Sequence, residues 1–184
     1  MCCLIGFAWP ALGESIPGAM QDSLPLPSYG TGKAVVRLYT DYFCSPCRAV
    51  EPELEPILVN LVKLKKITVT FVDTPIHKDS QIYARYFLYA INKSNNLEYA
   101  IRTRSALFEA ALTKISGKDA LEEFLKGRGI AFAPVDAVPV LRKLNTYLQE
   151  DRVTSTPNCV IIKDGKSEKK VGAGEIVKAL KELQ

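Results

Sequence analysis

The order of strand-like and helix-like segments predicts that the chain folds as an α/β domain interrupted by an all-helical insertion. Residues 34–40 and 66–72 are rich in β-branched and aromatic residues, and the stretch between them repeats apolar residues at helical spacing. Four further helical patterns fill residues 79–150, and strand character returns only at residue 158. A third observation concerns chemistry, because two cysteines three residues apart stand where the first strand passes into the first helix.

The elements of the first half follow from apolar spacing and from its breaks. After the strand at 34–40, a helix is expected over 45–65 because its apolar residues recur at intervals of three and four: Val50, Leu54, Ile57, Leu58, Leu61 and Val62. The strand at 66–72 ends at Asp73-Thr74-Pro75. Helices are then expected at 79–92, 97–115, 118–126 and 139–150, separated by short runs rich in Ser, Asn or Gly.

The C-terminal part returns to strands. Residues 158–163 and 167–171 flank Asp164-Gly165, a dipeptide typical of tight hairpins, and an amphipathic helix follows at 175–183. We therefore divide the chain into an α/β part, residues 34–75 and 151–184, and a helical insertion, residues 76–150.

The composition predicts a folded protein with a sizeable core. The chain has 184 residues, of which 47% are hydrophobic and 24% charged. The 24 Lys and Arg exceed the 20 Asp and Glu by only four, and no long basic run is present. Nucleic acid is therefore not expected as a partner. No apolar stretch reaches the roughly 18 residues of a membrane span.

The N-terminal residues predict export. Residues 2–9 are apolar, and small residues at 11 and 13 follow in the pattern of a signal cleavage site. We expect residues 1–13 to be a signal segment and the protein to be periplasmic or otherwise extracytoplasmic. Residues 14–33, rich in Pro and Gly, are expected to form an extended lead-in with at most a short edge strand. Loss of the signal segment would leave three thiols: Cys44, Cys47 and Cys159.

Redox chemistry is predicted by the motif Cys44-Ser45-Pro46-Cys47. Two cysteines three apart in a first helical turn have their sulfurs on one face, close enough for a disulfide. The helix N-terminus favours the thiolate of Cys44, so we expect an accessible sulfur whose pKa lies below the free value of about 8.5. Cys47, one turn further, is expected to be shielded. Cys44 would then exchange with a partner and Cys47 would resolve the mixed disulfide.

A second candidate feature is the pair Thr156-Pro157 at the start of the strand at 158–163. Proline at that place indicates a deliberate end to strand pairing. We expect a cis Thr156–Pro157 bond that turns the backbone towards the cysteine pair and leaves the main-chain groups of Thr156 free for an extended peptide.

These motifs resemble those of thioredoxin-fold thiol–disulfide oxidoreductases, and more narrowly of the DsbA-like family. The matching positions are Tyr42 to Cys47, Pro52 in the following helix, Thr156-Pro157, and the closing hairpin from Ile161 to Gly172. The resemblance covers about residues 34–74 and 151–184. It implies a thioredoxin-like fold with an inserted all-helical domain. It also implies a redox partner, expected to be a membrane protein, that resets the enzyme.

The chain departs from that family in two places. Many members carry a buried carboxylate six residues before the first cysteine, where it helps to move protons to the resolving thiol, and here that position is Leu38. Asp41 is nearer to the cysteine pair in sequence and could substitute for that carboxylate, but a carboxylate in a turn is expected to be solvated. Strongly oxidising members have His between the cysteines, so Ser45-Pro46 implies a milder oxidant.

Other roles for these residues are weaker. A zinc site needs at least two ligands beyond the cysteine pair, and only Cys159 and His77 are available, so no metal is expected. A purely structural disulfide is disfavoured because a cysteine pair at a helix start is better placed for exchange. Cys159 is expected to be a small buried apolar residue, with a third redox-accessible sulfur as the alternative. His77 is expected to lie in a surface loop without a role.

We therefore expect an exported, monomeric oxidoreductase that exchanges a Cys44–Cys47 disulfide with cysteine-containing protein substrates, acts as their oxidant, and needs no cofactor. A dimeric isomerase is disfavoured because residues 14–33 are too short for a dimerisation domain. Two alternatives stay open: a reductant of the same fold, for example in cytochrome maturation, and a non-catalytic thioredoxin-like binding module.

Overall fold

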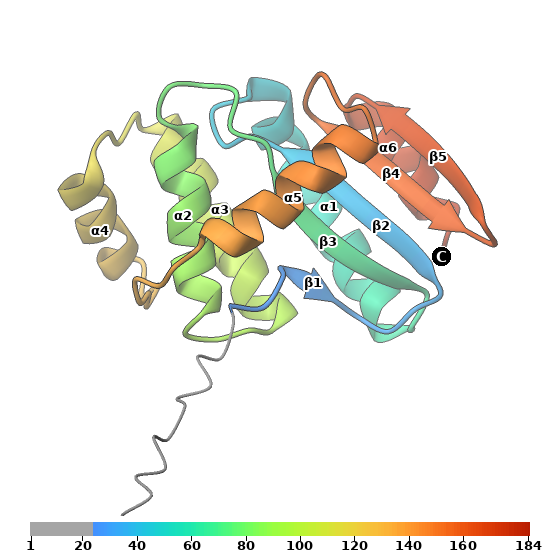
Figure 1. Cartoon of the computed structure of the whole chain (residues 1–184), viewed down its shortest axis with the longest axis horizontal. Coiled ribbons are helices and arrows are strands. Elements are labelled where there is room, and N and C mark those ends of the chain that lie inside the picture. Colours follow the sequence, from blue (N-terminus) through green and yellow to red (C-terminus); the bar gives the residue numbers. More distant parts are fainter. Residues whose placement is uncertain (1–23) are drawn as a thin grey trace, which may run out of the picture.

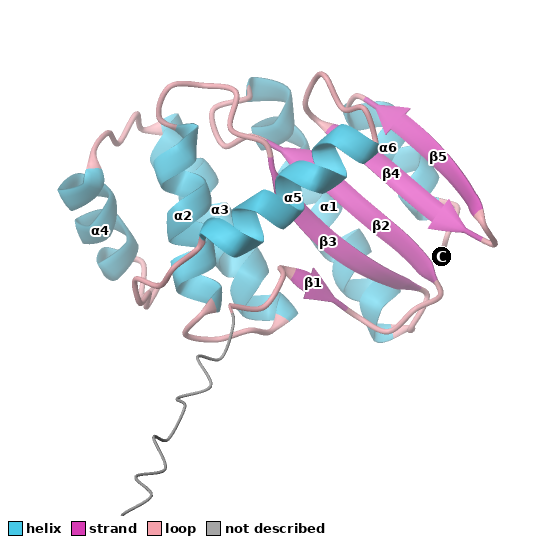
Figure 2. Cartoon of the chain, in the orientation of Figure 1, coloured by secondary structure: helices cyan, strands magenta, loops and turns pink. Residues whose placement is uncertain are grey.

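The computed structural model describes residues 24–184. The expected signal segment, residues 1–13, and the first part of the lead-in lie outside the described residues. A five-stranded mixed sheet forms the centre of the molecule (Figure 2), in the order β1-β3-β2-β4-β5. The strands are β1 (Ser28–Tyr29), β2 (Ala34–Thr40), β3 (Ile67–Asp73), β4 (Asn158–Lys163) and β5 (Lys166–Val171). Strand β3 runs parallel to β2, and the other neighbours are antiparallel.

Helices cover both faces of this sheet (Figure 1). Helix α1 (Ser45–Lys63) and helix α6 (Ala173–Lys181) pack together behind it, and α5 (Val138–Glu150) crosses in front. Helices α2 (Ser80–Ile91), α3 (Leu97–Leu112) and α4 (Lys118–Gly127) lie beside the sheet, and α3 also contacts α1. None of the helices within residues 24–184 is long and apolar enough to cross a bilayer.

The sequence predicted every long element in the right order, with small differences at the ends. Helix α3 stops at Leu112 rather than at residue 115, because Lys114 adopts the left-handed φ of 57° that ends a helical turn. Helix α6 begins at Ala173, two residues earlier than expected, directly after Gly172 at φ 86°. The lead-in contributes only the two-residue edge strand β1.

Helix α5 is held against the sheet by polar contacts to β2. The Tyr39 hydroxyl donates to the Asp151 carboxylate and, over 3.2 Å, to the carbonyl oxygen of Tyr147. The Arg37 guanidinium contacts Asp151 at 3.1 Å and lies 3.9 Å from the centre of the Tyr147 ring. This helix, which the sequence groups with the inserted helices, therefore packs directly on the sheet that supports the cysteine pair.

Candidate active site

Helix α1 begins at the cysteine pair, directly beyond the end of β2. Cys44 caps the helix, and the Cys47 backbone N–H donates to the Cys44 Sγ over 3.3 Å. The Cys44 N–H donates to the Asp41 carbonyl oxygen over 3.1 Å, which closes the turn between β2 and α1. The two cysteines form a disulfide whose Cα atoms are 5.3 Å apart. Unpaired N–H groups and the positive end of the helix dipole meet the sulfur here, and both favour an anion.

The exposure of the two cysteines differs from the expectation in one respect. Cys47 is fully buried, as expected, but Cys44 is only 6% exposed. The expectation of an open Cys44 sulfur is therefore wrong for this disulfide-bonded form, because Cys47 covers the sulfur on one side and the Thr156 main chain on another. Ser45 and Pro46, between the cysteines, are exposed.

The segment before β4 faces the disulfide. The Thr156–Pro157 bond is cis, as predicted, and the Thr156 carbonyl oxygen lies 3.4 Å from the Cys44 Sγ. The Pro157 carbonyl oxygen accepts from the Gly172 N–H over 3.0 Å, which ties the loop to the end of β5. The buried Thr156 hydroxyl has no hydrogen-bond partner within residues 24–184. The two motifs that lie 112 residues apart in sequence therefore form one site.

Asp41 is not the solvated turn residue that the sequence predicted. Its side chain is fully buried, and its two carboxylate oxygens accept from the backbone N–H groups of Phe43 and Ile76, both over 2.8 Å, and of His77 over 3.3 Å. The His77 Nδ1 lies 3.0 Å from Asp41 Oδ1. The carboxylate is buried because it satisfies the N–H groups of two loops, and it thereby joins the turn that carries Cys44 to the loop after β3.

A buried group of charges, which the sequence analysis missed, lies beneath this end of the sheet. Arg104 of α3 is fully buried and donates to both carboxylate oxygens of Glu51 in α1, over 2.7 and 2.9 Å. It also donates to the Thr40 hydroxyl over 3.0 Å and approaches Asp73 Oδ1 at 3.5 Å. The Tyr42 hydroxyl donates to Asp73 Oδ2 over 3.2 Å. The group connects α1, α3 and the ends of β2 and β3.

The charges in this group are set by burial and by each other. Burial, opposed by Arg104, raises the pKa of Asp73 to about 7. Burial lowers the pKa of Arg104, but Glu51 and the other acidic neighbours raise it more, so the guanidinium stays charged. Glu51 lies four residues after Cys47 and shares its face of α1. Leu38 is fully buried in β2, so no carboxylate stands at that position.

Cys159 and His77 occupy the places that the sequence predicted for them. Cys159 is fully buried in β4, and burial raises the pKa of its thiol to about 12. The expectation of a small buried apolar residue is confirmed, and the alternative of a third accessible sulfur is wrong. The His77 side chain is 46% exposed in the loop after β3, but it has Asp41 as a partner.

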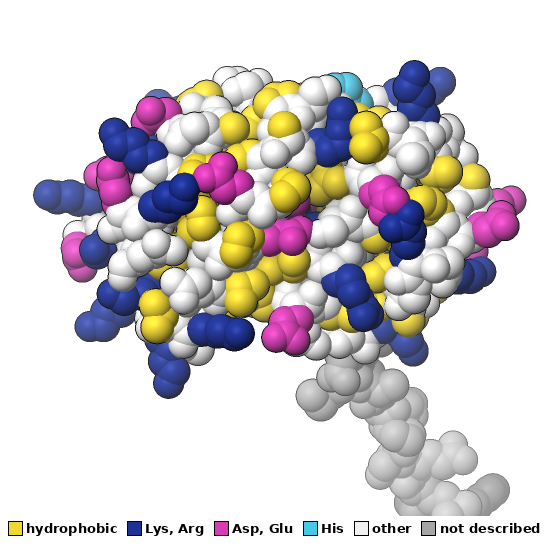
Figure 3. Space-filling view, turned by 180° about the vertical axis from the view of Figure 1, so that it is seen from behind, with side chains coloured by type: hydrophobic (Ala, Val, Ile, Leu, Met, Phe, Trp, Pro, Cys, Tyr) yellow, Lys and Arg dark blue, Asp and Glu magenta, His cyan; other side chains and the backbone are white. Residues whose placement is uncertain are grey.

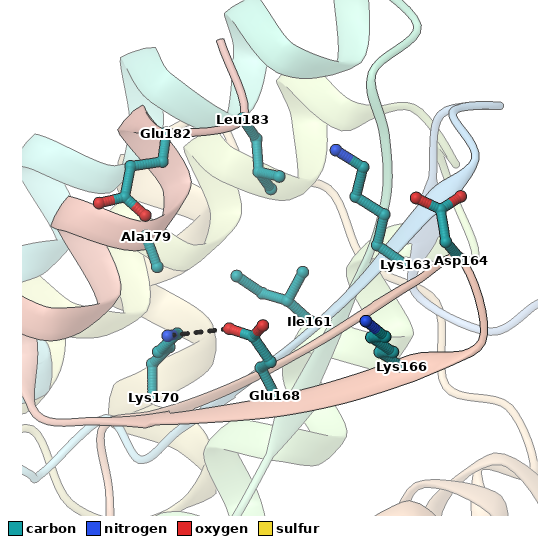
Figure 4. A pocket seen from close by; sticks show the side chains of 9 residues that line it. All are labelled: Ile161, Lys163, Asp164, Lys166, Glu168, Lys170, Ala179, Glu182 and Leu183. Carbon is teal, nitrogen blue, oxygen red and sulfur yellow. Dashed lines mark ion pairs between the residues drawn. The ribbon is translucent and has the colours of Figure 1, made fainter.

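A cavity lies away from the disulfide, between the β4–β5 hairpin and the end of α6 (Figure 4). It measures about 350 Å³, and lysines and acids alternate around it, with Lys170 and Glu168 paired at 3.0 Å. Because both charges line the cavity, it favours neither an anionic nor a cationic ligand. Within residues 24–184, no three His, Cys, Asp or Glu side chains are grouped so that they would hold a metal ion.

The thioredoxin family matches residues 27–182 of the sequence, which include both motifs and nearly all the described chain. The chain belongs to the thioredoxin family. No curated protein sequence matches the chain.

Solved structures share the fold of this thioredoxin-family chain. A Pseudomonas syringae protein, provisionally assigned as a protein-disulfide isomerase, superposes with a TM-score of 0.65 at 17% identity over 89% of this chain and 98% of its own. A periplasmic thioredoxin-like protein from Salmonella enterica serovar Typhimurium has a TM-score of 0.63 at 20% identity, over 86% of this chain and 89% of its own. Pseudomonas aeruginosa DsbA2 has a TM-score of 0.59 at 15% identity, over 86% of this chain and 93% of its own. At these identities the likeness shows the fold.

Proposed function

We propose that the protein is a thiol–disulfide oxidoreductase that exchanges its Cys44–Cys47 disulfide with cysteines of protein substrates, in the oxidising direction. The observation that carries this proposal is the position of the disulfide at the N-terminus of α1, with the Thr156 carbonyl oxygen 3.4 Å from the Cys44 Sγ. A structural staple has no need of a helix N-terminus or of a facing main-chain loop. An exchange site uses both, one to stabilise the leaving sulfur and the other to align a peptide.

The reaction follows from this geometry in two balanced steps. A substrate thiolate attacks the Cys44 Sγ, so that a substrate–Cys44 bond forms, the Cys44–Cys47 bond breaks, and Cys47 leaves as a thiolate that takes up a proton. A second substrate thiolate then attacks the substrate sulfur of this mixed disulfide and releases the Cys44 thiolate. The substrate loses two electrons as its disulfide forms, and the cysteine pair gains them. A separate redox partner, for which we propose a membrane protein, would reoxidise the pair.

The direction of exchange depends on how far the site stabilises the thiolate of Cys44. The capping position of Cys44 favours the reduced form, and Ser45-Pro46 supplies no additional charged donor between the sulfurs. We propose a mild oxidant, which equilibration with glutathione tests directly. A potential well above thioredoxin's roughly −270 mV is expected, and a value at or below it would assign the protein as a reductant.

We further propose that the protein works outside the cytoplasm. The apolar run at residues 2–9 and the small residues after it support a signal segment. One of the structures with the same fold is that of a periplasmic protein. Fractionation of cells that produce the full chain, followed by mass spectrometry of its N-terminus, tests both export and cleavage near residue 13.

A binding module with an inactive cysteine pair is the second candidate, because Cys44 is only 6% exposed. The oxidised protein mixed with a reduced unfolded polypeptide separates the two functions. The oxidoreductase is expected to convert substrate thiols to disulfides, and Cys44→Ser is expected to abolish this. A module would bind the polypeptide equally well with either residue and leave its thiols unchanged.

A further inference from the structure

A small groove opens between α1 and α3, next to the cysteine pair. It measures about 160 Å³, and its apolar lining comes from Pro52, Phe108 and Leu112, with Arg48 at the end nearest the disulfide. Leu112 is 59% exposed. Pockets that enclose drug-sized ligands measure about 300–1,000 Å³, so this groove suits a single side chain. Figure 3 shows the face that carries α1 and α3, on which apolar side chains lie among charged ones.

Arg48 connects this groove to the disulfide. It follows Cys47 directly, and its Nη2 lies 3.5 Å from the Ser45 hydroxyl oxygen, so the guanidinium reaches back over the residues between the two sulfurs. Within residues 24–184, no carboxylate lies within ion-pair distance of Arg48. Among the described residues, Arg48 is therefore a half-exposed cation without a counter-ion, in the first turn of α1 and one residue after Cys47.

The carboxylates around the groove are engaged elsewhere. Glu51 is held by both donor groups of the buried Arg104, at 2.7 and 2.9 Å. Glu109 pairs with Arg128, and Glu55 accepts from the Ser105 hydroxyl. None of these three carboxylates pairs with Arg48, so its guanidinium is available to an incoming acidic group.

We propose that Arg48 and this groove select substrates, by binding the polypeptide segment around the reacting cysteine. An acidic side chain of the substrate pairs with the Arg48 guanidinium, and an apolar side chain enters the groove between Pro52, Phe108 and Leu112. The occupant is an extended substrate segment in which the reacting cysteine is followed, at increasing distance, by an acidic residue and then by an apolar one. This inference rests on the proposed exchange function, whose site it extends along α1.

The spacing of the substrate motif follows from helix geometry. Arg48 and Pro52 stand four and eight residues beyond Cys44, which corresponds to about 6 and 12 Å along α1. An extended chain advances about 3.3–3.6 Å per residue. The acidic residue is therefore expected about two residues from the substrate cysteine, and the apolar residue about three or four.

A panel of two-cysteine peptides tests the proposal on the full, oxidised protein. Two positions vary, both counted from the same cysteine. The residue two positions away is Glu, Gln or Lys, and the residue four positions away is Leu or Ser. The rate at which each peptide reduces the Cys44–Cys47 disulfide is measured after an acid quench, and each rate is divided by that of the neutral dithiol dithiothreitol. An exposed ion pair predicts that the Glu peptide reacts about 1.5- to 5-fold faster than the Gln peptide at low salt. High salt should remove the difference.

Two variants and a matched control assign the effect to residues. Arg48→Gln is expected to equalise the Glu and Gln peptides, and Leu112→Ser to reduce the preference for Leu over Ser at the fourth position. Arg142→Gln on α5, across the sheet, removes another exposed arginine and is expected to keep both preferences.

The outcomes separate this inference from the function on which it rests. If dithiothreitol and all peptides react, but Arg48→Gln keeps the Glu-to-Gln ratio, the docking inference fails and the exchange function stands. The inference also fails if Arg48→Gln changes the dithiothreitol rate and every peptide rate by one common factor, because Arg48 would then act on the sulfur. If dithiothreitol reduces the disulfide but no peptide does, the exchange function fails, and the inference fails with it.

Discussion

Replacement of Arg104 by Met is expected to destabilise the fold strongly. It removes the buried guanidinium that pairs with the Glu51 carboxylate. Arg104 is fully buried, and the side chain of Glu51 is only 6% exposed, so the carboxylate would be left in an apolar environment. Breaking one side of a buried ion pair costs about 3–5 kcal/mol. For a protein of this size that corresponds to a fall in Tm of about 6–20 °C.

Urea unfolding followed by circular dichroism at pH 7, with the disulfide kept oxidised, measures this loss. The double variant Glu51→Gln with Arg104→Met is the control, because it removes the unpaired carboxylate together with the cation. Its stability is expected to lie between those of the wild type and of Arg104→Met. A loss below about 1 kcal/mol for Arg104→Met, or a double variant no more stable than the single one, would refute the reasoning.

Three further predictions follow from buried groups near the site. The pKa of Asp73 is raised from 3.8 to about 7, so between these values the folded chain keeps a proton that the unfolded chain has lost. The stability due to this proton is fully present below about pH 4 and is lost as the pH rises through about 7. Urea unfolding at several pH values should show that the free energy of unfolding changes less with pH in Asp73→Asn than in the wild type. Asp41→Ala removes the acceptor of three backbone N–H groups and is expected to lose about 1–3 kcal/mol and to speed amide hydrogen exchange at Phe43 and Ile76; unchanged exchange would contradict the contacts described. Cys159 is expected to resist iodoacetamide at pH 8 until the protein unfolds, and labelling of the native protein at this residue would show that β4 opens.

The order of elements was predictable because each signal is local in sequence. Apolar spacing locates α1, and Asp164-Gly165 locates the β4–β5 hairpin, without knowledge of the rest of the chain. The cysteine pair and Thr156-Pro157 were predictable as parts of a site because both belong to recognisable motifs. Their contact, 3.4 Å between Thr156 O and Cys44 Sγ, is a property of the folded sheet.

The buried polar contacts were harder to predict because their partners are distant in sequence. The Asp41 carboxylate is satisfied by N–H groups 35 and 36 residues later, which no local pattern reveals. The pairing of Glu51 with Arg104 did leave a signal. Each residue interrupts the buried face of its helix, Glu51 among Val50 and Leu54, and the two have opposite charges. Opposite charges in two apolar helix faces indicate a buried ion pair, but not which other groups complete it.

The reactivity of Cys44 in the reduced protein tests the central claim most directly. The rate of its alkylation by iodoacetamide is measured from pH 5 to 9, with mass spectrometry to confirm that Cys44 is the residue modified. If the N-terminus of α1 stabilises the anion, the rate should reach its plateau well below pH 8. A rate that rises only through about pH 8.5, as for a free cysteine, would contradict the claim and leave a binding module as the better description.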